Sequence, residues 1–187
     1  AAFEIQLGDY GIYACRIKSR DVQASYEFFK KEGAKLLSEV MKTPEGKAHF
    51  LVEDPNGNVF DVVEGLDWFS NTGNPSKTGG VAGAMIAVSD MKKALKFYQE
   101  VLGYTEIVYD KTAVYDAFSN LPAGDKKIQR VLLRHDGLRK GPFAQLLGPT
   151  EIELVQAIER TDCRPMFENR FWGDWGFIHL CFDIQGM

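Results

Sequence analysis

Three ionisable side chains interrupt short apolar runs of the β-strand type: Asp61, Glu153 and His179. Successive side chains of a strand point to opposite faces, so each of the three faces either solvent or an enclosed site. A carboxylate in a site can act as a general base, and carboxylate and imidazole groups together can bind a divalent metal ion. The chemistry of this chain therefore depends on whether the fold gathers these groups in one place.

Each of the three also has a purely structural interpretation. Glu153 shares its predicted strand face with Glu151, a pattern typical of a solvated surface. His179 shares its face with Asp183, which can satisfy the imidazole by a hydrogen bond. A further histidine, His49, lies on a predicted strand and either packs there or lines a cavity. The sequence leaves both interpretations open for all four residues.

The elements that carry these residues form an internal repeat. In each of two units, a strand leads into a helix with a predicted N-cap residue, Asp21 in the first unit and Ser89 or Asp90 in the second, and with a glycine where the helix should end. The apolar residues of both helices recur at helical spacing. The first unit contains Ile12–Ser19, Asp21 and Gly33, and the second contains Ala84–Val88, Asp90 and Gly103.

Three further strands are predicted after each helix. In the first unit a turn, Asp54-Pro-Asn-Gly57, joins the last two strands, because proline pre-sets its second position and glycine accepts a positive φ. Each unit is therefore strand, helix and three strands. The strands are Lys35–Val40, Lys47–Glu53 and Val59–Glu64 in the first unit, and Tyr104–Tyr109, Ile128–Arg134 and Thr150–Gln156 in the second.

The repeat predicts the organisation of the whole chain. An apolar segment, Phe3–Leu7, is similar to the closing strand of a unit, and Phe177–Ile184 is similar to an opening strand. We therefore expect a piece of a longer array, with an unpaired last strand that pairs with another copy or a neighbouring unit. The predicted segments are a strand remnant at 1–10, the first unit at 11–69, a linker at 70–80, the second unit at 81–160, and an aromatic connector plus a truncated third unit at 161–187.

Three stretches of the chain resemble the vicinal oxygen chelate superfamily, the group of glyoxalases, bleomycin resistance proteins and extradiol dioxygenases. They are the turn Glu53–Asn58, the segment Val88–Gly103 with its Phe-Tyr and Leu-Gly pairs, and the closing strand Glu151–Gln156. The resemblance implies an α+β fold. Its tandem βαβββ modules form half-barrel sheets around a cup, each with a helix on its outer face.

The resemblance also implies where a metal ion would bind. In metal-dependent members, the opening strand of each half supplies His or Gln and the closing strand supplies Glu. The closing positions fall at Asp61 and Glu153, whereas the opening positions fall at Ala14 and Gly83, which have no ligating side chain. His179 takes the opening position of the truncated third unit. The implied metal ligands are thus Glu153, His179 and Asp61, completed by residues beyond the chain or by another chain.

Two functions follow from this resemblance. The first is a metal-assisted lyase, isomerase or dioxygenase, in which Zn, Fe, Mn, Co or Ni polarises a substrate with adjacent oxygens and Glu153 is the catalytic base. The alternative is a metal-free protein that binds a small, antibiotic-like molecule. In that case Ala14 and Gly83 leave space for the ligand, His49 lines it, and aromatic residues favour flat molecules. A structural unit whose catalysis belongs to other modules is a third possibility.

Composition narrows the class of protein. The 187 residues carry a net charge of −4 without a basic cluster, so neither the charge nor a motif indicates nucleic acid. No apolar run approaches the roughly 20 residues of a membrane span. The three cysteines form no paired motif, which fits a reducing compartment. We expect a cytoplasmic protein with a small-molecule ligand, present as a homodimer or strand-swapped oligomer.

Overall fold

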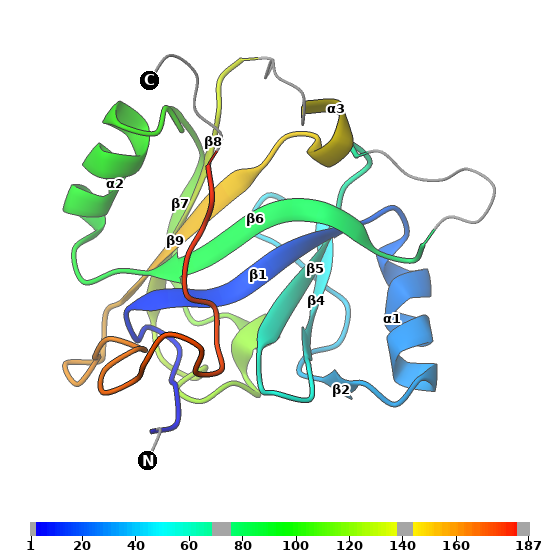
Figure 1. Ribbon diagram of the computed structural model, residues 1–187, viewed down its shortest axis with the longest axis horizontal. Coiled ribbons are helices and arrows are strands. Elements are labelled where there is room, and N and C mark those ends of the chain that lie inside the picture. Colours follow the sequence, from blue (N-terminus) through cyan, green and yellow to red (C-terminus); the bar gives the residue numbers. More distant parts are fainter. Residues whose placement is uncertain (1–2, 69–75, 138–143, 183–187) are drawn as a thin grey trace.

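The computed structural model describes residues 3–68, 76–137 and 144–182 (Figure 1). Both repeat helices begin where their aspartates predict. The Asp21 side chain accepts a hydrogen bond from the backbone N–H of Ala24 and caps α1, Val22–Lys31. Asp90 accepts one from Lys93 and caps α2, Met91–Glu100. Among the described residues, no helix has the length and hydropathy needed to cross a lipid bilayer.

Each unit contributes its strands to one shared sheet. The first unit supplies β1 (Gly11–Ser19), β2 (Lys35–Leu36), β3 (Met41–Lys42), β4 (Ala48–Glu53) and β5 (Val59–Glu64). The second supplies β6 (Gly79–Ala87), β7 (Glu106–Ala113), β8 (Ile128–Arg134) and β9 (Glu151–Ala157). A 3₁₀ turn, Asp116–Phe118, and a short helix α3, Ala144–Leu147, lie between the strands of the second unit.

The two opening strands join the units. Within the described residues the sheet order is β2-β4-β5-β1-β6-β9-β8-β7, with β3 paired to β4. The strands β1 and β6 are antiparallel neighbours, and each pairs in parallel with the closing strand of its own unit, β5 or β9. The fold is therefore the predicted α+β arrangement of two βαβββ modules in one large curved sheet.

The sheet has two different faces. One face carries both helices. Tyr26 of α1 packs in an apolar cluster with Phe50 of β4, and Met91 of α2 packs in another with Leu154 of β9. We call the opposite face the inner face. One end of the inner face is filled by a third apolar cluster, which brings Phe118 and Leu121 of the second unit onto β1. The remainder of the inner face carries charged side chains.

Some predicted strands are shorter or absent. Phe3–Leu7 forms a turn-containing segment without strand pairing, and β2 keeps two residues of the predicted Lys35–Val40. No strand is assigned in 177–182; residues 183–184 lie outside the described part of the chain. This segment instead crosses the helix-bearing face between α1 and α2 (Figure 1), where Phe177 contacts Phe60 and Phe182 contacts Tyr104. Its apolar side chains thereby cover the sheet without backbone pairing. Most of the predicted linker, 70–75, is likewise outside the described residues.

Candidate functional site

The two closing-strand carboxylates lie on the inner face and are fully buried. Asp61 on β5 and Glu153 on β9 both have 0% exposure. Asp61 is in register with Arg16 of β1, and Glu153 is in register with Met85 of β6. Because β1 and β6 are neighbours, the repeat places the two carboxylates on either side of the strands that join the units.

Asp61 is held by a basic side chain on each side. Arg16 Nε donates to Asp61 Oδ2 at 2.9 Å, and His49 Nδ1 lies 2.8 Å from Asp61 Oδ1. Burial alone would raise the pKa of Asp61, but the charges of His49 and Arg16 outweigh it and hold the pKa well below its ordinary value. Asp61 is therefore an ionised, acceptor-only group whose two oxygens are both engaged.

Glu153 is held in a similar way from the second unit. Arg130 Nε donates to Glu153 Oε1 at 2.5 Å, and the Tyr109 hydroxyl donates to the same oxygen at 2.7 Å. Burial acts to raise the pKa of Glu153, but the positive charges of Arg130 and Arg16 outweigh burial and hold this pKa below its ordinary value. Burial, together with the Glu153 carboxylate, raises the pKa of Tyr109, so its phenol stays protonated and remains a donor.

Arg16 connects the two units across the middle of the sheet. Its Nη1 donates to Glu151 Oε1 at 2.8 Å and lies 3.8 Å from Glu153 Oε2. Glu151 also accepts from Arg134 Nε at 2.8 Å. The inner face therefore carries one continuous ionic network, which we define as Arg16, His49, Asp61, Tyr109, Arg130, Arg134, Glu151 and Glu153.

The predicted ligand-binding residues have packing roles in this arrangement. Gly83 lies in register between Arg16 and Glu151, and a Cβ at position 83 would be 1.7 Å from the Glu151 carbonyl oxygen. Because Gly83 has no side chain, β6 can approach β9 and Arg16 can reach Glu151. The space that a side chain would take is therefore filled, and the glycine does not open a cavity. Ala14 is fully buried in the apolar cluster of the inner face, and His49 is bonded to Asp61.

A divalent metal ion does not fit these side chains. The free oxygen of Glu153, Oε2, faces the positive Arg16 guanidinium, which would repel a second cation. The predicted ligand His179 is exposed, lies in the segment that crosses the helix-bearing face, and stacks on Trp172 at 5.4 Å. Among the described residues, no group of three or more His, Cys, Asp or Glu side chains is placed to hold a metal ion.

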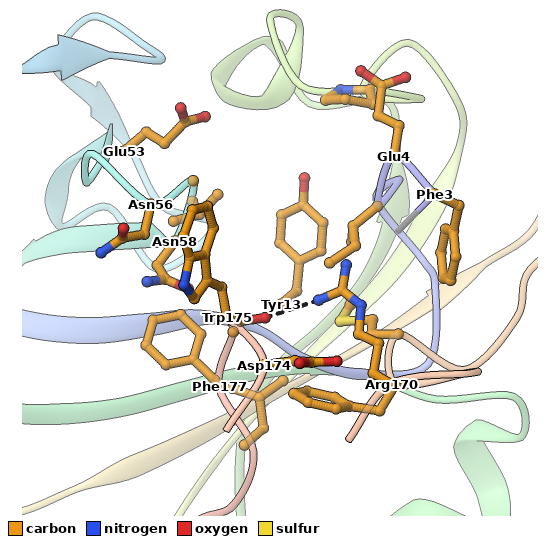
Figure 2. A pocket seen from close by; sticks show the side chains of 18 of the residues that line it. Phe3, Glu4, Tyr13, Glu53, Asn56, Asn58, Arg170, Asp174, Trp175 and Phe177 are labelled. Carbon is orange, nitrogen blue, oxygen red and sulfur yellow. Dashed lines mark hydrogen bonds between the residues drawn. The ribbon is translucent and has the colours of Figure 1, made fainter. Parts of the chain in front are cut away.

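A cavity of about 860 Å³ lies at the end of the sheet where β1 begins (Figure 2). The turn before β5, the N-terminal segment and the connector from Met166 to Phe177 form its walls. Tyr13, only 7% exposed, stands in the middle of the cavity with its hydroxyl directed into the open space. Burial, with the carboxylates of Asp9 and Glu53, raises the pKa of Tyr13, so this hydroxyl is neutral.

A smaller cavity, about 280 Å³, lies at the other end of the inner face. Lys18, Lys47, Arg134 and Glu151 are among its lining residues. Lys18 Nζ donates to the Asp67 carbonyl at 2.9 Å, and burial lowers the pKa of this amine. The smaller cavity therefore borders the ionic network through Arg134 and Glu151, whereas the lining of the cavity where β1 begins is rich in aromatic side chains and includes none of the network residues.

Arg16 and Arg130 are the functional residues that the sequence did not reveal. Both stand in strand-like runs, Arg16 two residues after Ala14 and Arg130 within Ile128–Arg134, and both are almost fully buried. An arginine at an inward-facing strand position is a signal in itself, because such a charge requires a buried partner. The partners come from other strands, so their identity depends on the register of the sheet.

Comparison with known proteins identifies the family. The model of the Glyoxalase/Bleomycin resistance protein/Dioxygenase superfamily matches residues 80–183, which is more than half of the chain. The chain belongs to this superfamily. The match begins at the second module and continues through the connector into the segment that contains His179. No curated protein matches the chain.

Solved structures of this superfamily share the fold. A glyoxalase I mutant from Zea mays superposes with a TM-score of 0.53 at 21% identity, covering 84% of this chain and 47% of that one. A putative dioxygenase from Bacillus subtilis superposes with a TM-score of 0.53 at 15% identity, covering 83% and 44%. The chain therefore spans about half the length of these proteins, and at these identities the likeness establishes the fold alone.

Proposed function

We propose that this chain is a metal-independent small-molecule-binding domain of the superfamily. The observation that carries the proposal is the neutralisation of both closing-strand carboxylates. Arg16 and Arg130 supply, within the chain, the positive charge that a divalent ion would otherwise supply to Asp61 and Glu153. Ligand space is present in the cavity of about 860 Å³ at the end of the sheet where β1 begins, and this volume is within the range of small-molecule sites.

The metal-assisted lyase, isomerase or dioxygenase is the competing hypothesis. It requires Zn, Fe, Mn, Co or Ni to displace two buried arginine–carboxylate pairs, or to use ligands from a further module or a second chain. Displacing such pairs leaves guanidinium groups buried without partners, which is costly. Glu153 would also have to lose Arg130 before it could act as a catalytic base.

A metal titration of the 187-residue chain separates the two hypotheses. After treatment with a chelator, we expect none of the five divalent ions to raise the melting temperature or to remain bound after desalting. A small-molecule library screened by thermal shift should, by contrast, contain stabilising compounds. Stoichiometric metal retained on the protein, together with a higher melting temperature, would contradict the proposal.

We also propose the modular division described above, with 11–69 as the first βαβββ module and 81–160 as the second. We also propose a homodimer or strand-swapped oligomer. Its support is the exposure of aromatic side chains in the connector, where Phe171 is 80% and Trp172 is 77% exposed. Exposed apolar groups gathered in one segment are typical of an interaction surface.

A further inference from the structure

We propose that the cavity of Figure 2 binds a flat organic cation, that is, a planar ring system carrying an amine or ammonium group. This inference rests on the proposed small-molecule function and specifies its ligand. Three features of the cavity support it: a neutral donor and acceptor at its centre, an excess of carboxylates around that centre, and aromatic side chains along one wall.

The centre of the cavity is the Tyr13 hydroxyl. The phenol ring is fixed because it belongs to the apolar cluster of the inner face with Met85 and Leu121. Among the described residues its hydroxyl has no hydrogen-bond partner, and it is directed into the cavity (Figure 2). Because a phenol hydroxyl can both donate and accept, this position is suited to a ligand that forms a hydrogen bond with it.

Carboxylates surround this hydroxyl. Glu53 lies on one side of Tyr13 and Glu4 on the other (Figure 2), and both are close enough to raise the pKa of the phenol. The cavity lining as a whole contains four acidic residues and two basic ones. One of the two basic residues, Lys35, is already bonded to Glu53 at 2.8 Å and is largely exposed. The local charge therefore favours a cation over an anion.

The second basic residue of the lining does not reverse this preference. Arg170 Nη1 donates to the Trp175 carbonyl at 2.8 Å, which holds the guanidinium against the connector. The same guanidinium lies 5.7 Å from the centre of the Phe167 ring. Arg170 is thus engaged in keeping the connector folded, on the side of Tyr13 away from Glu53 (Figure 2).

Aromatic rings supply the flat wall. Phe177 is fixed by an edge contact with Phe60, whose centroid is 5.5 Å away. Trp175 stands beside it at the mouth of the cavity and is 71% exposed, so a ligand could cover its ring (Figure 2). Aromatic faces attract both planar rings and cations, because the face of the π-system is negative. The wall and the carboxylates therefore select the same class of molecule.

Three probes that share the same naphthalene ring system but differ in charge test the assignment. We would titrate the 187-residue chain at pH 7 with 1-naphthylmethylammonium, 1-naphthylmethanol and 1-naphthoate by calorimetry. The ammonium probe should bind at least about tenfold more tightly than the carboxylate, with the alcohol between them. Equal affinities, or a preference for the carboxylate, would overturn the inference.

Paired variants assign the roles of single residues. Glu53→Gln should lower the affinity for the ammonium probe about threefold to tenfold. It should leave the affinity for the alcohol probe nearly unchanged, because the substitution removes only the charge of the side chain. Trp175→Ala should weaken all three probes to a similar extent, because it removes the stacking surface. The matched controls are Glu106→Gln and Trp172→Ala, since both side chains are exposed and neither lines the cavity. If a control variant has the same effect as its partner, binding occurs elsewhere and the inference is wrong.

The outcomes also separate this inference from the proposed function. If library compounds stabilise the metal-free protein while the naphthyl probes show no preference for the amine, the ligand assignment fails and the proposed function stands. If neither the library nor the probes bind, both fail. All variants are compared with the wild-type melting temperature, so that a loss of binding is not confused with a loss of folding.

Discussion

Arg16 is buried among three carboxylates, and its contacts balance negative charge on the inner face. Its side chain has 0% exposure, yet it bonds Asp61 of its own unit and Glu151 of the other. A buried ion pair contributes little net stability compared with apolar packing, because both charges lose their hydration. Removal of one partner alone is far more damaging, since the other charge then remains buried and unpaired.

We therefore expect Arg16→Met to destabilise the protein by about 3–5 kcal/mol, the range measured when one partner of a buried pair is removed. The free energy of unfolding from denaturant titration measures this loss. Lys126→Ala, which removes an exposed ion pair with Asp125, is the control and should leave stability unchanged. If Arg16→Met lowers the free energy of unfolding no more than the control does, the ionic network does not stabilise the fold.

Acid should destabilise the protein through the same carboxylates. The pKa values of Asp61 and Glu153 are held below their ordinary values in the folded state, so the unfolded state takes up their protons first. Their contribution to stability is complete at neutral pH and is lost as the pH falls below about 5.

Denaturant midpoints measured from pH 7 to pH 3 would detect this loss. In Asp61→Asn the titrating group is absent, so its stability should be lower at pH 7 but should fall less between pH 5 and pH 3. An unchanged slope in this variant would assign the acid sensitivity to other groups.

At the scale of elements, the approach of β6 to β9 depends on Gly83. Its φ is +149°, and the Glu151 carbonyl occupies the place of a Cβ. We expect Gly83→Ala to destabilise the protein by about 3 kcal/mol or more, because the backbone of the two strands must separate. Gly33→Ala is the matched control: its φ is +75°, but no atom lies within 4 Å, so about 1–2 kcal/mol of backbone strain is expected. Similar losses in urea titrations of the two variants would contradict a packing role for Gly83.

The helices and strands could be predicted from the sequence better than the contacts between them, because they depend on local signals. Helix caps, helix-ending glycines and strand alternation are local signals, so β5 and β8 have the predicted bounds and both helices start after their aspartates. The pairing of Arg16 with Glu151 joins residues 135 positions apart and depends on the register of β1, β6 and β9. His179 was assigned to a strand by its sequence pattern. However, a strand needs a partner, and none is assigned for 177–182.

At the scale of the whole molecule, the two modules form one sheet, and the connector leaves aromatic side chains in solvent. The proposed oligomer would cover them. Light scattering of the chain at micromolar concentration should then give twice the monomer mass of 21.0 kDa. A single species of 21.0 kDa across the accessible concentrations would reject the proposal for this chain.

The crowding of Gly83 limits where a histidine ligand for a metal ion could be introduced into this domain. The two repeats are alike in topology but unequal as scaffolds for new ligands. A histidine introduced at position 14 would replace a side chain that already points to the inner face, whereas one at position 83 would collide with the neighbouring main chain. A metal site engineered here would therefore be asymmetric. Its new histidine would come from the first unit, and the second unit would contribute only carboxylates that no longer pair with arginine.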